Sequence, residues 1–176
     1  MSMIETRDNE ILFRGLVVEI EHMEVKVGNK GWHPYQIIRH PGGVAVVPLH
    51  DDGTVTLIRQ LRPAVGEFLL ELPAGRLSPG EPPEACGRRE LLEETGLSAE
   101  RFQSLGSIHP TPGICDERIH LYLATGLTQG EAEQEAYEEI ETIRIPYAET
   151  LALAEIGAIT DSKTVAALFR ASRRVG

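Results

Sequence analysis

Short apolar runs separated by turn-forming residues dominate the first half of the chain, and this pattern is typical of strands. The segment 11–39 is predicted to be extended, with Gly28–Gly31 as the turn between two pieces. Val44–Leu49 (VAVVPL) and Val55–Leu61 (VTLIRQL) flank an Asp-Gly pair, which signals a hairpin. Further strands are predicted at 68–72, 102–109, 119–124 and 140–145.

Helical patterns appear in three places. The helix predicted at about 82–95 begins with prolines, which the first turn tolerates because its amides have no intrahelical partner, and it ends at a glycine. Two more helices are predicted at 147–155 and 161–173, and Asp161 or Ser162 is the expected N-cap of the second. Strands on both sides of a central helix favour an α/β fold in which a mixed sheet packs between helices.

Composition and charge exclude several classes of protein. A chain of 176 residues, 41% of them apolar, fits one globular domain with a full core. It has no secretory signal pattern and no run near the ~20 apolar residues of a membrane span, so we expect a cytoplasmic protein with no membrane partner. The formal net charge of −10 argues against a nucleic-acid partner.

The candidate chemistry lies on the helix predicted at 82–95. Glu90, Glu93 and Glu94 are three and four residues apart and therefore share one helical face, where like charges repel. A divalent cation would remove this repulsion, and Mg²⁺ prefers such hard oxygen ligands. A solvated acidic face, with Arg89 paired to Glu93, is the alternative that the glutamates alone allow.

The surrounding segment, 75–97 (GRLSPGEPPEACGRRELLEETGL), carries a longer pattern. A glycine is followed by five residues, Glu, seven residues, Arg-Glu, Leu, any residue, Glu-Glu, any residue, Gly and Leu. This pattern resembles the Nudix box. The resemblance implies a Nudix-type α/β/α sandwich with a mixed sheet, a Glu81–Arg89 ion pair and Mg²⁺ or Mn²⁺ as the cofactor. The implied metal ligands are the carbonyl of Ala74 and the carboxylates of Glu90, Glu93 and Glu94.

The expected chemistry is metal-assisted hydrolysis of a pyrophosphate bond. Cations on the acidic face would neutralise the phosphate oxygens, lower the pKa of a bound water and orient it for attack. Glu93 and Glu94 would thus be catalytic as well as metal-binding. No covalent protein nucleophile is needed.

A second pattern follows the box. Residues 109–117 (HPTPGICDE) place Pro112 fifteen residues beyond the last box position, Leu97. This loop resembles that of ADP-ribose pyrophosphatases, a resemblance that implies substrate contacts from Pro112 and Glu117. Arg62 is the candidate for a phosphate contact because a guanidinium matches phosphate geometry, and Arg59 could serve equally.

The N-terminal strands are similar to a small antiparallel sheet that these enzymes exchange between the subunits of a homodimer. The resemblance assigns residues 1–40 to that sheet and residues 41–176 to the Nudix hydrolase domain. Trp32 and Tyr35 lie just past the predicted turn. They are either core or interface aromatics, or one of them stacks on adenine.

One part of the chain departs from the subfamily pattern. The acidic stretch 131–141 is where the subfamily carries a further metal ligand, here Glu138, and a general base. The position of the base is occupied by Ala136, which cannot accept a proton. Glu135, Glu139 or Glu93 is the expected substitute.

Three functions are compatible with these patterns. The first is hydrolysis of ADP-ribose to AMP and ribose 5-phosphate. The second is the same chemistry on another nucleoside diphosphate sugar, such as GDP-mannose. The third, a nucleotide sensor without activity, ranks last because the box is intact.

Overall fold

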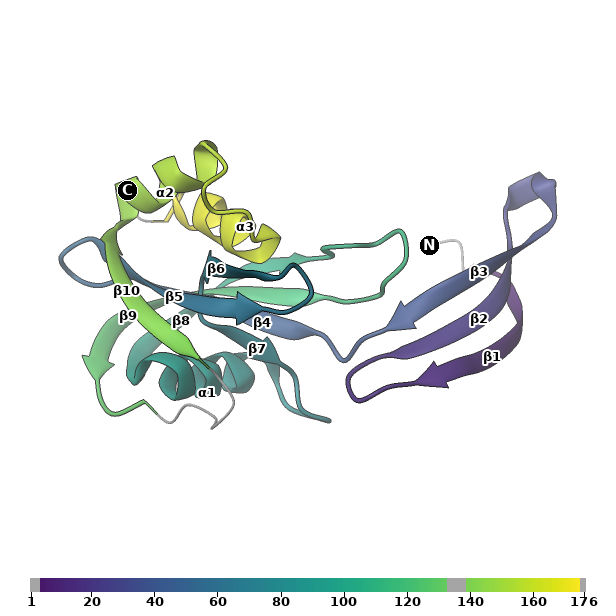
Figure 1. The fold of residues 1–176 in the computed structure, drawn as a ribbon, viewed down its shortest axis with the longest axis horizontal. Coiled ribbons are helices and arrows are strands. Elements are labelled where there is room, and N and C mark those ends of the chain that lie inside the picture. Colours follow the sequence, from purple (N-terminus) through teal and green to yellow (C-terminus); the bar gives the residue numbers. More distant parts are fainter. Residues whose placement is uncertain (1–3, 133–138, 175–176) are drawn as a thin grey trace. The chain divides into compact units, whose positions relative to one another are not determined.

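The computed structural model describes residues 4–132 and 139–174. Contacts divide the chain into two compact units, the first formed by residues 1–42 and 109–118 and the second by residues 43–108 and 119–176. Figure 1 shows the strands and helices of each unit. Within the described residues, no helix has both the length and the apolar character to cross a membrane.

The first unit contains a three-stranded antiparallel sheet in the order β1–β2–β3. Its strands are β1 (Thr6–Arg14), β2 (Glu19–Lys26) and β3 (Trp32–Arg39), and a single 3-10 turn, η1 (Gly28–Lys30), precedes β3. The predicted turn at Gly28–Gly31 between two extended pieces is confirmed, but the first piece is divided into β1 and β2 and begins earlier than residue 11. The prediction missed the first half of β1 because that strand is almost wholly exposed and has no apolar period.

Residues 109–118 belong to this first unit through hydrogen bonds to the end of β3. The backbone N–H of Ile38 donates to the carbonyl of Ile114 (2.8 Å), and that of Asp116 donates to the carbonyl of Ile38 (3.1 Å). The Asp116 carboxylate accepts from Arg39 Nη1 (3.0 Å) and from the His40 amide (2.9 Å). The loop is thus held both by its backbone and by the side chain of Asp116.

The second unit contains two sheets. The four-stranded mixed sheet has the order β7–β4–β9–β8, and the three-stranded antiparallel sheet has the order β10–β5–β6. In the mixed sheet β4 runs parallel to β9 and antiparallel to β7, and β8 is antiparallel to β9. The strands are β4 (Gly43–Pro48), β5 (Thr54–Arg62), β6 (Glu67–Glu71), β7 (Ala74–Arg76), β8 (Leu97–Ile108), β9 (Ile119–Gln129) and β10 (Ile140–Pro146).

The expected hairpin between β4 and β5 is only partly present. The turn forms, because the His50 amide donates to the Thr54 carbonyl (2.9 Å), but beyond the single bridge of Leu49 to Val55 the two strands join different sheets. Every residue of β4 is buried. A strand covered on both faces takes its partners from long-range packing, so the local Asp-Gly signal did not decide the pairing.

Three helices cover the sheets of this unit: α1 (Pro83–Thr95), α2 (Tyr147–Glu155) and α3 (Ser162–Ala171). Figure 1 shows α1 on one side of β4 and the other two helices on the opposite side. Alternate residues of β4 explain this arrangement, since neighbouring side chains on a strand point to opposite faces. Val46 packs with Leu91 of α1, whereas Ala45 and Val47 share a cluster with Leu168 of α3. The predicted α/β/α sandwich is confirmed.

The predicted end of α1 at Gly96 and the predicted start of α3 at Asp161 or Ser162 are also confirmed, whereas α3 ends at Ala171 and not at residue 173. Gly96 follows α1 in the left-handed conformation (φ 72°), and its N–H donates to the carbonyl of Leu92 (2.8 Å). A residue with a Cβ rarely adopts this conformation, so glycine is the natural end of the helix. Asp161 is the N-cap of α3, with its carboxylate accepting from the Thr164 amide (2.9 Å).

Candidate functional site

Arg89 organises the acidic face of α1. Its Nε and Nη2 donate to the two carboxylate oxygens of Glu81 (2.9 and 3.1 Å), which confirms the predicted ion pair. Its Nη1 donates to Glu90 (2.7 Å) and to Glu93 (2.9 Å). Hydrogen bonds from Arg89 lower the pKa of Glu81 to about 2. One guanidinium therefore holds three carboxylates and ties the loop before α1 to the helix.

Glu94 has a different environment from Glu93, although the two are adjacent. Glu94 is 3% exposed, and its Oε2 accepts a hydrogen bond from the backbone N–H of Ala74 (2.9 Å). The side chain of Glu93 is 33% exposed. The helix thus presents the carboxylate of Glu94 to strand β7 and that of Glu93 to solvent. This arrangement is expected if Glu94 anchors the site and Glu93 stays accessible.

Gly75 is required by the position of Glu90. A Cβ placed on Gly75 would lie 2.0 Å from both the Cδ and the Oε1 of Glu90, closer than any real contact. The glycine therefore leaves the space that the Glu90 carboxylate occupies. Ala74 and Gly75 in β7 and the glutamates of α1 form one contiguous site, and the family pattern of these residues has a direct steric reason here.

The chemistry of this donor set fits a hard divalent cation, because carboxylate and peptide carbonyl oxygens are the ligands that such ions prefer. Glu94 accepts a hydrogen bond from the N–H of Ala74, the residue whose carbonyl is the other predicted ligand. Within residues 4–132 and 139–174, however, no group of three or more acidic, His or Cys side chains is positioned to share one ion. Glu90 and Glu93 each bond to Arg89 Nη1 through one carboxylate oxygen, which leaves the second oxygen of each as the atom that would bind a cation.

A second charged network includes Arg62, the predicted phosphate contact. Its Nε and Nη2 donate to the two carboxylate oxygens of Glu71 (2.8 and 2.7 Å). Glu71 is only 1% exposed and also pairs with Lys163, which in turn lies 2.9 Å from Asp161. The side chain of Arg62 remains 36% exposed. Arg62 is thus held in place by a buried carboxylate, and no local sequence pattern indicates that Glu71 and Lys163 pair.

The same network fixes the segment that leads to Ala74. The Leu72 amide donates to the Thr164 hydroxyl (2.9 Å), and that hydroxyl donates to Asp161 (2.6 Å). Two residues later, the Ala74 amide donates to Glu94. The N-terminus of α3 and the acidic face of α1 therefore hold the two ends of one short segment. A disturbance at α3 is expected to reach the box through this backbone.

Gln60 adds an unsatisfied polar atom on the same strand as Arg62. Its Oε1 is buried and has no hydrogen-bond partner within the described part of the chain. Residues two apart on a strand point to the same face, so Gln60 and Arg62 share a face of β5. A buried acceptor without a partner costs about 1–3 kcal/mol. A donor supplied by a ligand or by its bound water would remove that cost.

Of the residues predicted for substrate recognition, Tyr35 and Pro112 line one pocket of about 620 Å³ in the first unit. Tyr35 is 41% exposed, so its ring is accessible. Trp32 does not line this pocket. The guanidinium of Arg7 lies over the Trp32 ring at 4.4 Å from its centroid, and this cation–π contact already covers one side of the ring.

Glu117, the other predicted substrate contact, faces two histidines. Its Oε1 lies 3.5 Å from His40 Nδ1, and its backbone carbonyl accepts from His109 Nδ1 (2.9 Å). The side chain is 26% exposed. In the late acidic stretch, Glu139 is exposed, whereas the predicted Glu135 and Glu138 and the position of Ala136 lie outside the described residues.

Comparison with known proteins agrees with this site. The chain is 32% identical over 166 residues to an ADP-ribose pyrophosphatase of Bacillus subtilis, and the aligned residues cover 93% of this chain and 90% of that protein. It is 36% identical, with the same coverage, to a methanol dehydrogenase activator of Bacillus methanolicus. It is 30% identical over 170 residues to a GDP-mannose pyrophosphatase of Cronobacter sakazakii, covering 90% of this chain and 86% of that one.

A crystal structure of an ADP compounds hydrolase has the same fold, with a TM-score of 0.86 over 99% of this chain and 95% of that one at 22% identity. A model of the NUDIX domain matches residues 39–168, which include β7, α1 and the charged network of Arg62. The box residues match the family pattern, and in the structure they also contact one another. Arg89 bonds to Glu81, Glu90 and Glu93, and Glu94 accepts from the Ala74 amide. This chain belongs to the Nudix family.

Proposed function

We propose that this protein hydrolyses the pyrophosphate bond of ADP-ribose to give AMP and ribose 5-phosphate. The observation that carries the proposal is the docking of the acidic face of α1 on Ala74 and Gly75, with Glu94 buried against the Ala74 amide. The likeness to an ADP-ribose pyrophosphatase over 93% of the chain supports the choice of substrate. The test is to incubate the purified chain with ADP-ribose and to measure the release of AMP by chromatography.

The metal would be held by Glu90, Glu93 and Glu94 together with the carbonyl of Ala74, and we propose Mg²⁺ or Mn²⁺. When bound, such a cation supplies charge neutralisation at phosphate and a water of lowered pKa. Glu81 restrains Arg89, and Glu71 restrains Arg62 as a phosphate contact. The general base is Glu93, Glu139 or Glu135. Glu138 is the further ligand expected in the late stretch.

Replacing Gly75 with Ala is expected to reduce activity on the order of a hundredfold, because displacement of a catalytic group by about 1 Å can have that effect. The new methyl group would occupy the position of the Glu90 carboxylate, which is the free end of a flexible side chain. The fold should therefore survive while the ligand moves. kcat for ADP-ribose and the melting temperature are to be measured together.

The control is Gly130→Ala, whose added Cβ would meet only the Gly96 carbonyl at 3.4 Å. It should keep both activity and stability. Full activity of Gly75→Ala would show that Glu90 does not need its observed position.

GDP-mannose is the second candidate substrate, and the GDP-mannose pyrophosphatase relative favours it. If Pro112 and Glu117 recognise the terminal ribose, ADP-ribose should exceed GDP-mannose and ADP-glucose in kcat/KM. Hydrogen bonds to one sugar leave polar groups unpaired with another, which discriminates strongly. Glu117→Ala should lower kcat/KM for ADP-ribose more than for the other two substrates. Equal kcat/KM values, or a uniform effect of the substitution, would favour a broad nucleotide-sugar hydrolase.

We also propose a homodimer in which the N-terminal strands of residues 1–40 are exchanged. The exposed apolar side chains of Leu12 and Phe13 in β1 and of Leu16 and Val17 in the connection to β2 support it, since clustered exposed apolar residues are typical of an interface. A two-fold symmetric dimer is expected in light scattering. A monomer that retains full activity would exclude the exchange. Either Trp32 or Tyr35 would stack on adenine, and the accessible ring of Tyr35 makes it the better candidate.

The remaining partners follow from charge and cysteine chemistry. The net charge of −10 supports a small-molecule substrate and no nucleic acid. Both cysteines, Cys86 and Cys115, are free thiols, which supports a reducing compartment, and we propose the cytoplasm.

A further inference from the structure

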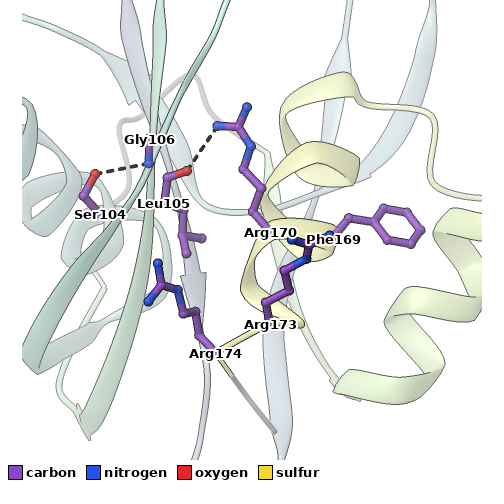
Figure 2. Close-up of a pocket in the computed structure, with 7 residues that line it drawn as sticks. All are labelled: Ser104, Leu105, Gly106, Phe169, Arg170, Arg173 and Arg174. Carbon is purple, nitrogen blue, oxygen red and sulfur yellow. Dashed lines mark hydrogen bonds between the residues drawn. The ribbon is translucent and has the colours of Figure 1, made fainter.

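A pocket in the second unit combines three arginines of the C-terminal segment with the edge of β8. It has a volume of about 660 Å³. Figure 2 shows the two sides, with Ser104, Leu105 and Gly106 on β8 and Arg170, Arg173 and Arg174 on α3 and the turn after it. The side chains of Arg170 and Arg174 extend toward Leu105. The ring of Phe169, which also borders the pocket, points away from Arg173 and Arg174. The lining of the pocket is therefore strongly basic, although the net charge of the chain is −10.

These arginines are not neutralised by carboxylates. Most Lys and Arg side chains of the protein have an acidic group within 4.0 Å, as Arg62, Arg89 and Lys163 do. Arg170, Arg173 and Arg174 have none in the part of the chain that the structure describes. Three uncompensated cations along one pocket repel each other, and an anion would relieve that repulsion.

Arg170 is oriented by the protein itself. Its Nη1 donates to the carbonyls of Leu105 and Ser107, each at 3.1 Å. Nη1 carries two hydrogens, so these two bonds use it fully and leave the edge formed by Nε and Nη2 without a protein partner in the described residues. That edge is the one that binds two phosphate oxygens in parallel. Figure 2 shows Nη1 turned toward Leu105, with the other terminal nitrogen directed away from it.

The β8 side of the pocket is shaped to allow this contact. The pairing of β8 with β9 is irregular between Ser104 and Gly106, and Gly106 has φ +88°. A Cβ on Gly106 would lie 3.2 Å from Arg170 Nη1, which is tighter than an ordinary contact. A glycine in a bulge thus lets the guanidinium reach two carbonyls of the strand.

We propose that this pocket is a second anion site, which binds a phosphate dianion through Arg170, Arg173 and Arg174. The ligand is inorganic phosphate or the phosphate group of a small phosphomonoester. Cations near the end of α3 also interact favourably with the helix dipole. That effect accounts for stability without a ligand, and it does not require the free Nε–Nη2 edge or the pocket. The site is separate from the acidic face of α1 and does not depend on the proposed hydrolysis.

The test is calorimetric titration of the full chain at fixed ionic strength, with EDTA present so that metal at the box does not contribute. Inorganic phosphate and ribose 5-phosphate are titrated separately. We expect saturable binding to the wild type. In Arg173→Gln/Arg174→Gln, affinity should fall about tenfold or more, because charge-assisted hydrogen bonds are lost. Both side chains are exposed, so this variant should fold normally.

The matched control is Arg14→Gln/Lys30→Gln, which removes two exposed cations from the first unit and gives the same net charge. It should bind phosphate as the wild type does. The tighter of the two ligands identifies free phosphate or a phosphomonoester as the natural ligand class. Absence of saturable binding to the wild type, unchanged affinity in the Arg173/Arg174 variant, or an equal loss in the control would each overturn the proposal.

Discussion

Glu94→Gln is expected to abolish most hydrolytic activity while leaving the fold intact. Glu94 is 3% exposed and accepts the Ala74 amide through Oε2. Glutamine has the same shape and can still accept that hydrogen bond, so the contact between α1 and β7 survives. The negative charge that would bind a cation is lost. Removing such an interaction costs several kcal/mol in the transition state, so kcat should fall roughly a hundredfold to a thousandfold.

The measurement is kcat for ADP-ribose at saturating Mg²⁺, with circular dichroism as the test of folding. Glu84→Gln is a matched control, because Glu84 lies in the first turn of the same helix and pairs with Arg88 on the surface. This control should retain near wild-type activity. Turnover of Glu94→Gln within a factor of a few of wild type would show that the acidic face of α1 does not hold the catalytic metal.

Glu71→Gln is expected to cause the largest loss of stability among single substitutions of charged residues. Glu71 is 1% exposed and pairs with both Arg62 and Lys163. Removing one partner of a buried ion pair leaves the opposite charge uncompensated, which costs about 3–5 kcal/mol. Because the side chain of Arg62 is 36% exposed and can recruit water, we expect about 3 kcal/mol, at the lower end of that range. Urea denaturation at pH 7 gives the free energy of unfolding.

The pH dependence provides an independent check. Burial raises the pKa of Glu71, but hydrogen bonds from Arg62 and the charge of Lys163 outweigh it, so its pKa is lowered overall. A lowered pKa in the folded state contributes stability that is present above the unfolded value of 4.5 and is lost as the pH falls through the folded value. The wild type should therefore lose stability in acid more steeply than Glu71→Gln does.

Glu67→Gln is the control for this substitution, since Glu67 is exposed on the same strand, β6. Its effect on unfolding should stay within the small range that is typical of surface substitutions. If Glu71→Gln were as stable as this control, the buried network would not hold β6 to α3. Reduced activity of Glu71→Gln at a pH where it remains folded would in turn indicate that Arg62 needs this support.

The sequence alone determined the features that depend on short spacings. The helix at 83–95, its end at Gly96 and the Glu81–Arg89 ion pair all involve residues within a few turns of one another. The helix and its end follow from helical periodicity and from the left-handed conformation available to glycine. The ion pair was implied by the resemblance of the segment to the Nudix box, since Glu81 precedes the helix. The N-cap of α3 was narrowed to Asp161 or Ser162 because short polar side chains accept from the first amides of a helix, and the structure shows Asp161.

Only the tertiary structure decided the contacts between distant segments. Glu71 and Lys163 are 92 residues apart, and neither carries a local pattern that reveals the buried pair. The strands that pair with β4 and β5 likewise depend on which strand faces are buried. The Asp-Gly hairpin signal between β4 and β5 contains no information on that burial. Local patterns indicate the conformation that a segment prefers. Pairing between distant segments depends on whether both partners are buried, and burial results from the packing of the whole chain.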